Sequence, residues 1–161
     1  MGHPVLRARA RPIERTELLR PAFQTLIDDM IETMVEYRGV GLAAPQVHQG
    51  VRLFVASLGS DDERPSETYV IVNPEVVPVG SVVEEDWEGC LSIPDIRGRV
   101  PRPHEVRLRA LDRNGERLEL KAHGFPARII QHETDHLDGV LFFDRMKTLE
   151  SLAFLDEYSK Y

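Results

Sequence analysis

The chain has 161 residues, of which 42% are hydrophobic and 29% charged. This length predicts one domain, residues 1–161, because domains usually run to about 100–200 residues. The formal net charge of −7 argues against direct binding of nucleic acid and against docking on an anionic membrane, since both favour basic surfaces. Cys90 is the single cysteine, so an internal disulfide is excluded and a reducing compartment is favoured.

The N-terminal segment carries no recognisable targeting signal. Prolines and arginines interrupt it before an apolar core of about 7–15 residues can form, which excludes a secretory signal. It lacks serine and contains Glu14 and Glu17, which argues against a transit peptide. No run approaches the roughly 18 apolar residues of a membrane span. We therefore expect a cytoplasmic location rather than an organellar matrix.

The first predicted element is a helix over residues 21–37. Apolar residues recur there at a spacing of three and four, Pro21 suits the first helical position, and Gly39 lies just past the end. The predicted core-facing stripe consists of Phe23, Leu26, Ile27, Met30, Ile31, Met34 and Val35.

Strands are predicted next, followed by a second helix. The predicted strands are 51–57, 69–72, 76–79, 106–111 and 118–122. An exposed loop is expected at 59–66, and Asn114-Gly115 predicts a hairpin between the last two strands. A helix is expected at 126–137, and a weaker one from Leu149. This order indicates an α+β fold rather than the regular alternation of a parallel sheet.

The second helix carries His132-Glu133-Thr134-Asp135-His136, an HExxH pattern. Residues four apart lie one above the other on a helix, so both imidazoles can reach one metal ion. Glu133 is one position round the helix, where it can reach a water on that metal. The pattern therefore predicts a metal site with an acid–base residue beside it.

The third metal ligand has several candidates, because a catalytic site of the zinc type uses three protein ligands. A metzincin would place a histidine where this chain has Phe142, so that class is excluded. Glu150 or Glu157 would suit a metalloendopeptidase with a carboxylate ligand. Cys90 would supply a thiolate, which is a strong ligand for a borderline metal. A closed structural site would need a fourth ligand such as His123.

Two further segments bear on the site. Gly89 adjoins Cys90, and a glycine there permits a close approach of backbone to the site. Residues 39–46, Gly-Val-Gly-Leu-Ala-Ala-Pro-Gln, form a small, glycine-rich stretch that ends in an amide side chain. This stretch lacks the Gly-Lys-Ser/Thr ending of a phosphate loop.

Taken together, the motifs resemble those of the peptide deformylases. That family shows GxGxAAxQ, EGCLS and QHExDHLxG in this order, and every specified position matches at residues 39–46, 88–92 and 131–139. The resemblance covers essentially the whole chain. It implies an α+β fold with mixed, mainly antiparallel sheets packed around a central metal-binding HExxH helix.

The resemblance also implies a function and a metal. The expected enzyme is a metal-dependent hydrolase that removes the N-formyl group from the N-terminal formylmethionine of newly synthesised proteins. The implied ligands are Cys90, His132 and His136, with Fe²⁺ as the usual native metal and Zn²⁺, Ni²⁺ or Co²⁺ able to replace it. The implied partners are formylmethionyl nascent peptides and, transiently, the ribosome. Among lysines and arginines only Lys160 follows Lys147, which argues against ribosome docking through a basic C-terminal helix.

The chemistry assigns further roles. Formamide hydrolysis needs an activated water, and a bound dication can lower the pKa of water from about 15.7 to about 7. Glu133 is placed to act as general base and then general acid. By resemblance, the Gln46 amide and the Leu91 backbone N–H stabilise the oxyanion. The substrate-binding residues that we expect are Val40, Gly41, Gly89 and Ile129, with Phe125 a further candidate.

Supporting roles are expected for residues around the motifs. Glu88 is expected to have a structural role, paired with Arg97 or Arg102, and Gln131 is expected to make a supporting hydrogen bond. Asp135 and Asp138 could orient a metal-binding histidine or be solvated charges, and Asp135 is the favoured candidate because the family motif specifies it. The histidines outside the motifs are expected at the surface; they are His3, His48, His104 and His123.

Overall fold

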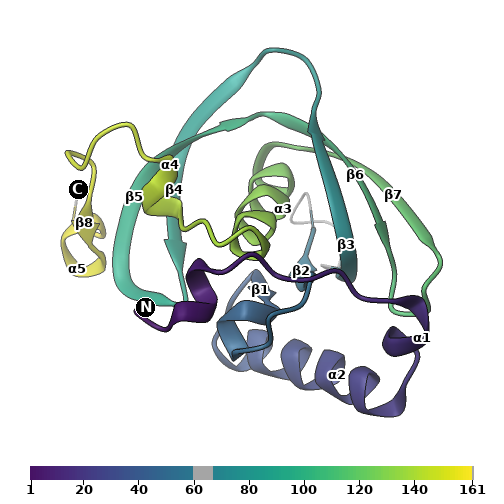
Figure 1. The fold of residues 1–161 in the computed structure, drawn as a ribbon. Coiled ribbons are helices and arrows are strands. Elements are labelled where there is room, and N and C mark those ends of the chain that lie inside the picture. The colour runs from purple at the N-terminus through teal and green to yellow at the C-terminus, as the bar shows by residue number, and fades with distance from the viewer. Residues whose placement is uncertain (60–66, 161) are drawn as a thin grey trace.

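The computed structural model describes residues 1–59 and 67–160. Two antiparallel sheets lie on either side of the helix α3 (Gly124–Leu137), which runs through the middle of the molecule (Figure 1). The predicted α+β architecture around the HExxH helix is therefore confirmed. In the described part of the chain, parallel pairing is confined to an isolated bridge between Arg11 and Val51.

The larger sheet has five strands in the order β1-β2-β3-β6-β7. The strands are β1 (Gly41–Ala43), β2 (Leu53–Ser57), β3 (Thr68–Pro78), β6 (Glu105–Leu111) and β7 (Arg117–His123). The hairpin at Asn114-Gly115 is confirmed, since the Gly115 N–H donates to the Asp112 carbonyl at 3.0 Å between β6 and β7.

Two predicted strands, 69–72 and 76–79, are one continuous strand β3 with a bulge between Val72 and Glu75. Asn73 lies in this bulge at φ 50°. Its side chain replaces the missing ladder contacts by accepting from the Ile13 N–H at 2.9 Å and donating to the Ile13 carbonyl at 2.8 Å. The Asn-Pro pair thus bends the strand without ending it.

The outer face of the larger sheet is covered by α2 (Pro21–Glu36), which begins and ends close to the predicted helix. Ile27, Met30 and Met34 are buried there, as the stripe predicts, whereas Val35 is 65% exposed and was wrongly included. Val35 lies one position past Met34, which turns it away from the sheet. The shorter helices before it are η1 (Pro4–Arg7) and α1 (Arg15–Leu18).

The smaller sheet has the order β4-β5-β8 and was not predicted from the sequence. Its strands are β4 (Val83–Cys90), β5 (Ile93–Pro103) and β8 (Ala153–Phe154). The helix expected from Leu149 is wrong: Phe154 pairs with Ile96 on the edge of β5, and only the single turn α5 (Leu155–Tyr158) follows. The open edge of β5 supplies backbone partners that a weak helical propensity does not outweigh.

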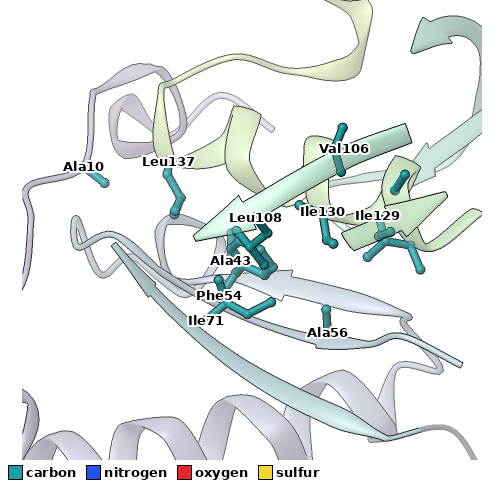
Figure 2. Close-up of a cluster of buried hydrophobic side chains, with 12 residues drawn as sticks. Ala10, Ala43, Phe54, Ala56, Ile71, Val106, Leu108, Ile129, Ile130 and Leu137 are labelled. Carbon is teal, nitrogen blue, oxygen red and sulfur yellow. The ribbon is translucent and has the colours of Figure 1, made fainter. Parts of the chain in front are cut away.

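Helix α3 is fixed to the larger sheet by an apolar core (Figure 2). Ile129, Ile130 and Leu137 of the helix pack against side chains of the sheet that include Phe54 and Leu108. The helix begins two residues earlier than predicted, at Gly124. Strands β4 and β5 form an antiparallel hairpin, called the hairpin from here on. A smaller cluster beside it contains Cys90, Ile93, Val100, Leu141 and Phe142, the last of these in α4 (Phe142–Arg145). Of the predicted loop 59–66, residues 60–66 lie outside the described residues.

Candidate metal centre and active site

The HExxH residues lie on the buried side of α3. His132 and His136 are one turn apart, and their ring centroids are separated by 5.0 Å. Both histidines are buried, as is Glu133 between them in the sequence. The helical period alone therefore brings two imidazoles together, as predicted.

Cys90 completes the group from the end of β4. Its Sγ lies 3.3 Å from Nε2 of His136, and the ligand atoms of Cys90, His132 and His136 all lie within 4.8 Å of one another. Metal–ligand bonds of about 2.0–2.3 Å in a tetrahedral site bring donor atoms to separations of this order. The donor set, one thiolate and two imidazoles, suits a borderline divalent transition metal.

The other candidate ligands lie elsewhere. Glu150 is exposed, and Glu157 pairs with Lys160 at 2.7 Å. His123 is exposed at the start of α3, with its ring 6.3 Å from that of His104. Among the described residues, the group that could hold a metal is therefore limited to Cys90, His132 and His136.

A carboxylate holds the first histidine in place, and it comes from Glu88. Its Oε2 lies 2.9 Å from Nδ1 of His132. When Nδ1 carries the proton, Nε2 of His132 is left free to face the metal. The expectation that Asp135 orients a histidine is wrong in this respect, because Asp135 pairs with Arg102 and Arg145 instead.

Glu88 and Asp135 belong to a buried ionic network between α3 and the hairpin. The Arg102 Nε and Nη2 donate to the two oxygens of Glu88 at 2.9 and 3.0 Å. Of the two partners expected for Glu88, Arg97 and Arg102, the structure shows Arg102. Arg128 adds a bond to Glu88 at 2.8 Å. Burial by itself would raise the pKa of Glu88, but His132 and Arg102 outweigh it and lower the pKa to about 2. Glu88 is therefore a carboxylate at neutral pH.

Gln131 also links α3 to strand β5. Its Nε2 donates to the carbonyls of Pro103 and Ala127 at 2.9 and 3.0 Å, so the expected supporting hydrogen bond is present. The histidines outside the motifs are exposed or half-exposed, as expected, and His3 stacks on His48 at 4.2 Å.

The surroundings shift the pKa values of the two histidines in opposite directions. Burial lowers the pKa of His132, yet the contacts with Cys90 and Glu88 more than compensate and raise it to about 10. Burial and the neighbouring His132 lower the pKa of His136 to about 3. A metal ion binds a neutral imidazole, so a metal and a proton compete for the nitrogens of these histidines.

Glu133 is buried beside the ligands and faces the first glycine-rich motif. Among the described residues, no group makes a hydrogen bond to its Oε2. Burial is the main cause that raises the pKa of Glu133 to about 7. A Cβ atom at Gly41 would overlap the carboxylate of Glu133, so the glycine at that position is required by this close approach.

Gln46 lies in the short helix η2 (Ala44–Val47), on the other side of Cys90. Its Oε1 accepts from the Ala43 N–H at 2.8 Å, which turns the amino group toward Cys90. Nε2 lies 3.5 Å from Sγ of Cys90 and 3.1 Å from Oγ of Ser92. Leu91 follows Cys90 in the turn between β4 and β5 and lines the same pocket.

A pocket of about 780 Å³ opens above these residues. It is lined by all four expected substrate-binding residues, Val40, Gly41, Gly89 and Ile129, and by Phe125. Sequence reasoning missed Trp87, Arg97, Arg128 and Leu155, which also line it. The paired strand β4 would have placed the first two, but its pairing with β5 was not predicted.

Gly89 also leaves room for a neighbouring side chain. A Cβ atom there would overlap the guanidinium of Arg97, which lies across the backbone at this point. The Arg97 Nη1 also donates to the carbonyl of its neighbour Ile96 at 3.0 Å. Glu88 therefore pairs with Arg102, while Arg97 covers the strand next to it.

The candidate group offers three protein ligand atoms from two elements, so a metal held there would keep a fourth position for an exchangeable ligand. Catalytic sites keep such a position, whereas structural sites are closed by a fourth protein ligand. Beside the candidate group lies a buried oxygen of Glu133 that has no hydrogen-bond partner among the described residues, and this arrangement is that of a metal-dependent hydrolase of the HExxH class. Among the described helices, none is both long and apolar enough to cross a membrane.

Comparison with known proteins identifies the family. The family model of polypeptide deformylase matches residues 1–152. Peptide deformylase 1 of Bordetella pertussis is 41% identical over 160 residues, which cover 97% of this chain and 90% of the relative. The peptide deformylase of Salinibacter ruber is 46% identical over 156 residues, covering 91% and 78%.

Solved structures agree with this. The crystal structure of a class I type b peptide deformylase from Acinetobacter baumannii with Met-Ala-Ser bound has a TM-score of 0.84 at 40% identity, covering 91% of this chain and 94% of that one. The enzyme from Thermotoga maritima has a TM-score of 0.83 at 38% identity, covering 92% and 95%. The chain belongs to the polypeptide deformylase family. Its activity is that of the family, hydrolysis of the N-formyl group from the N-terminus of newly synthesised proteins.

Proposed function

We propose that Cys90, His132 and His136 hold one divalent metal ion, with Fe²⁺ native and Zn²⁺, Ni²⁺ or Co²⁺ able to replace it. The convergence of the three side chains within 4.8 Å is the observation that carries this assignment. When bound, the metal supplies Lewis acidity and a lowered pKa for a coordinated water. The remaining steps belong to side chains of this chain.

Glu133 moves the proton. Its buried Oε2 lacks a hydrogen-bond partner among the described residues, so it is free to accept a proton from the attacking water. The same carboxyl group then gives that proton to the departing amine, which leaves as a neutral N-terminus. The C–N bond breaks, the formyl group leaves as formic acid that loses its remaining proton to solvent as formate, and Glu133 returns to the carboxylate.

Gln46 and Leu91 stabilise the charge that develops on the formyl oxygen. Because Ala43 fixes the carbonyl end of the Gln46 side chain, the amino group presents its N–H toward the site without further reorientation. The backbone N–H of Leu91 is the second donor. Donors that are already oriented contribute most in a buried site, and loss of one costs about 10²–10³ in rate.

The pocket holds the start of a nascent peptide in an extended conformation. β1 and β4 are the outermost strands of their sheets and both line the pocket, so each can pair with a substrate backbone. Val40, Gly41, Gly89 and Ile129 bind the formylmethionyl residue, with the side chain directed toward Ile129 and Phe125. The relative from Acinetobacter baumannii, which binds Met-Ala-Ser, supports a peptide that begins with methionine.

The proposed place of action is the cytoplasm, where the substrate arises on the ribosome. A reducing compartment also keeps Cys90 available as a thiolate ligand. Contact with the ribosome is transient and does not use the C-terminal turn α5, whose acidic residues are Asp156 and Glu157.

An anaerobic assay on formyl-Met peptides, with metal content measured in each sample, tests these roles. We expect formate release from the metal-loaded protein, and a fall of about 10²–10⁴ in kcat for Glu133→Ala with its metal retained. The matched control is Glu32→Ala, which removes an exposed glutamate of α2 and should keep full activity. Absence of formate release from the metal-loaded wild type would overturn the function, and an active Glu133→Ala variant would overturn the role of Glu133.

A further inference from the structure

The pocket extends beyond the family motifs to the C-terminal segment. Leu155, the first residue of α5, lines the pocket together with Trp87 and Arg97 of the hairpin. The match to the family model ends at residue 152. The wall that Leu155 forms therefore lies outside the three motifs and outside the residues that the family model matches.

This segment is anchored at several points. Ala153 and Phe154 pair with Arg97 and Ile96 on the edge of β5. The ring of Tyr158 lies edge-on to the ring of Trp87, with centroids 4.9 Å apart and an interplanar angle of 60°. In Figure 1 the yellow C-terminal segment accordingly lies against β5. Leu155 is thus held between two fixed contacts and forms a wall of the pocket.

Strand alternation separates the two faces of the hairpin. Glu88 points toward α3, where it contacts His132. Its neighbours on β4, Trp87 and Gly89, therefore face the opposite side, since successive residues of a strand point to opposite faces. Arg97 pairs with Gly89 and lies across it on that outer side. Trp87, Arg97 and Leu155 consequently surround the outer part of the pocket.

An extended substrate obeys the same alternation. If the formylmethionyl side chain enters beside Ile129, on the α3 side of β4, the side chain of the next residue points to the outer face. We propose that Trp87 and Leu155 form an apolar subsite for the second residue of the substrate, so that an apolar side chain there is preferred over glycine. This inference rests on the proposed peptide binding beside β4.

The chemistry of the subsite is that of apolar contact. Trp87 offers a ring edge, Leu155 a branched aliphatic side chain, and the Arg97 guanidinium is engaged by the Ile96 carbonyl at 3.0 Å. Both Trp87 and Leu155 are only partly buried, so an apolar substrate side chain would remove further apolar surface from water. Trp87 and Leu155 contact the second residue of the substrate and not the formyl group. Their contacts therefore affect which peptide is preferred.

The test compares formyl-Met-Leu-Ser with formyl-Met-Gly-Ser on the metal-loaded protein. For the wild type we expect kcat/KM to favour the leucine peptide by about tenfold, the order of selectivity that one or a few methylene contacts provide. Leu155→Ala should lower this ratio by about three- to fivefold. Leu155→Trp, which fills the subsite, should lower it further by excluding the leucine side chain.

The matched control is Phe154→Ala, which alters an adjacent side chain that is 66% exposed and leaves the backbone pairing of β8 in place. Thermal unfolding of each variant confirms that it is folded. The subsite is overturned if the ratio is unchanged in both Leu155 variants, or if Phe154→Ala lowers it equally. If the wild type hydrolyses neither peptide, the proposed function fails; if it hydrolyses both without preference, only the subsite fails.

Discussion

Helix α3 and the β4–β5 hairpin both supply residues of the candidate metal centre, but they do so by different means. The helix places His132, Glu133 and His136 within five consecutive residues, so its own period assembles most of the site. The hairpin supplies Cys90 and Glu88, which are 46 and 44 residues before their histidine partners. Their positions depend on how the hairpin packs against the helix.

The two sides of α3 are also packed by different forces. Toward the larger sheet the contacts are apolar, as Figure 2 shows for Ile130 and Leu137. Toward the hairpin they are largely ionic, through Arg102 and Arg128. An apolar core tolerates small adjustments of side chains, whereas a charged network fixes directions through its hydrogen bonds. The fold therefore anchors the helix on one face and aims its ligands on the other.

Cys90→Ala gives the largest expected effect, because it removes the hairpin's ligand and leaves the helix intact. We expect the protein to lose its metal on dialysis, with a loss of affinity well beyond the roughly 10–100-fold of outer-shell substitutions, and to lose formate release with it. Metal content per chain measures this directly. Glu157→Ala serves as the control and should retain the metal; a Cys90→Ala variant that keeps its metal would mean that the helix binds with another ligand.

Gln46→Ala is expected to act on the reaction alone. Removal of one oriented donor should lower kcat by about 10²–10³ with the metal content unchanged. Ser92→Ala is the matched control, since it removes the 3.1 Å partner of Nε2 and keeps the amide itself. Near-full kcat in Gln46→Ala would exclude the oxyanion role, and an equal loss in Ser92→Ala would assign the effect to the position of the side chain.

The helix side of the molecule could be predicted from the sequence, and the hairpin side could not. Periodicity indicated α2, the flanking proline and glycine indicated α3, and Asn114-Gly115 indicated the hairpin between β6 and β7, because these signals are local. Strand β4 has no such signal: its residues Val83 to Cys90 include four acidic side chains. A buried acidic residue such as Glu88 is stable in this strand because distant segments supply its partners, Arg102 and Arg128.

The dependence on distant segments also explains why Asp135, rather than Glu88, was expected to orient a histidine. Asp135 lies next to His136 in the sequence and invited a direct contact, but the helix turns it toward Arg102 and Arg145. Glu88, although it lies within a recognised motif, reaches His132 only through the packing of β4 on α3. The candidate ligands and part of the pocket lining could be named from the sequence because motifs identify residues. Which groups orient them depends on tertiary contacts.

Glu88→Gln gives the smallest of these effects, and it tests whether the hairpin aims the helix's ligand. The amide keeps the shape of the side chain but removes the negative charge that strengthens the hydrogen bond from His132 Nδ1–H. We expect the affinity for Ni²⁺, measured by competition with a chelator, to fall by about 10–100-fold. Because the substitution also weakens a buried network, a loss of stability accompanies it.

Asp135→Asn separates these two consequences. It weakens the same network at Arg102, while the contact of Glu88 with His132 remains. If Glu88 acts by orienting His132, Asp135→Asn should lose stability and keep its Ni²⁺ affinity within about threefold, well short of the loss expected of an outer-shell partner. Equal losses of affinity in the two variants would mean that the network stiffens the site as a whole. The hairpin would then hold the helix without aiming its ligand.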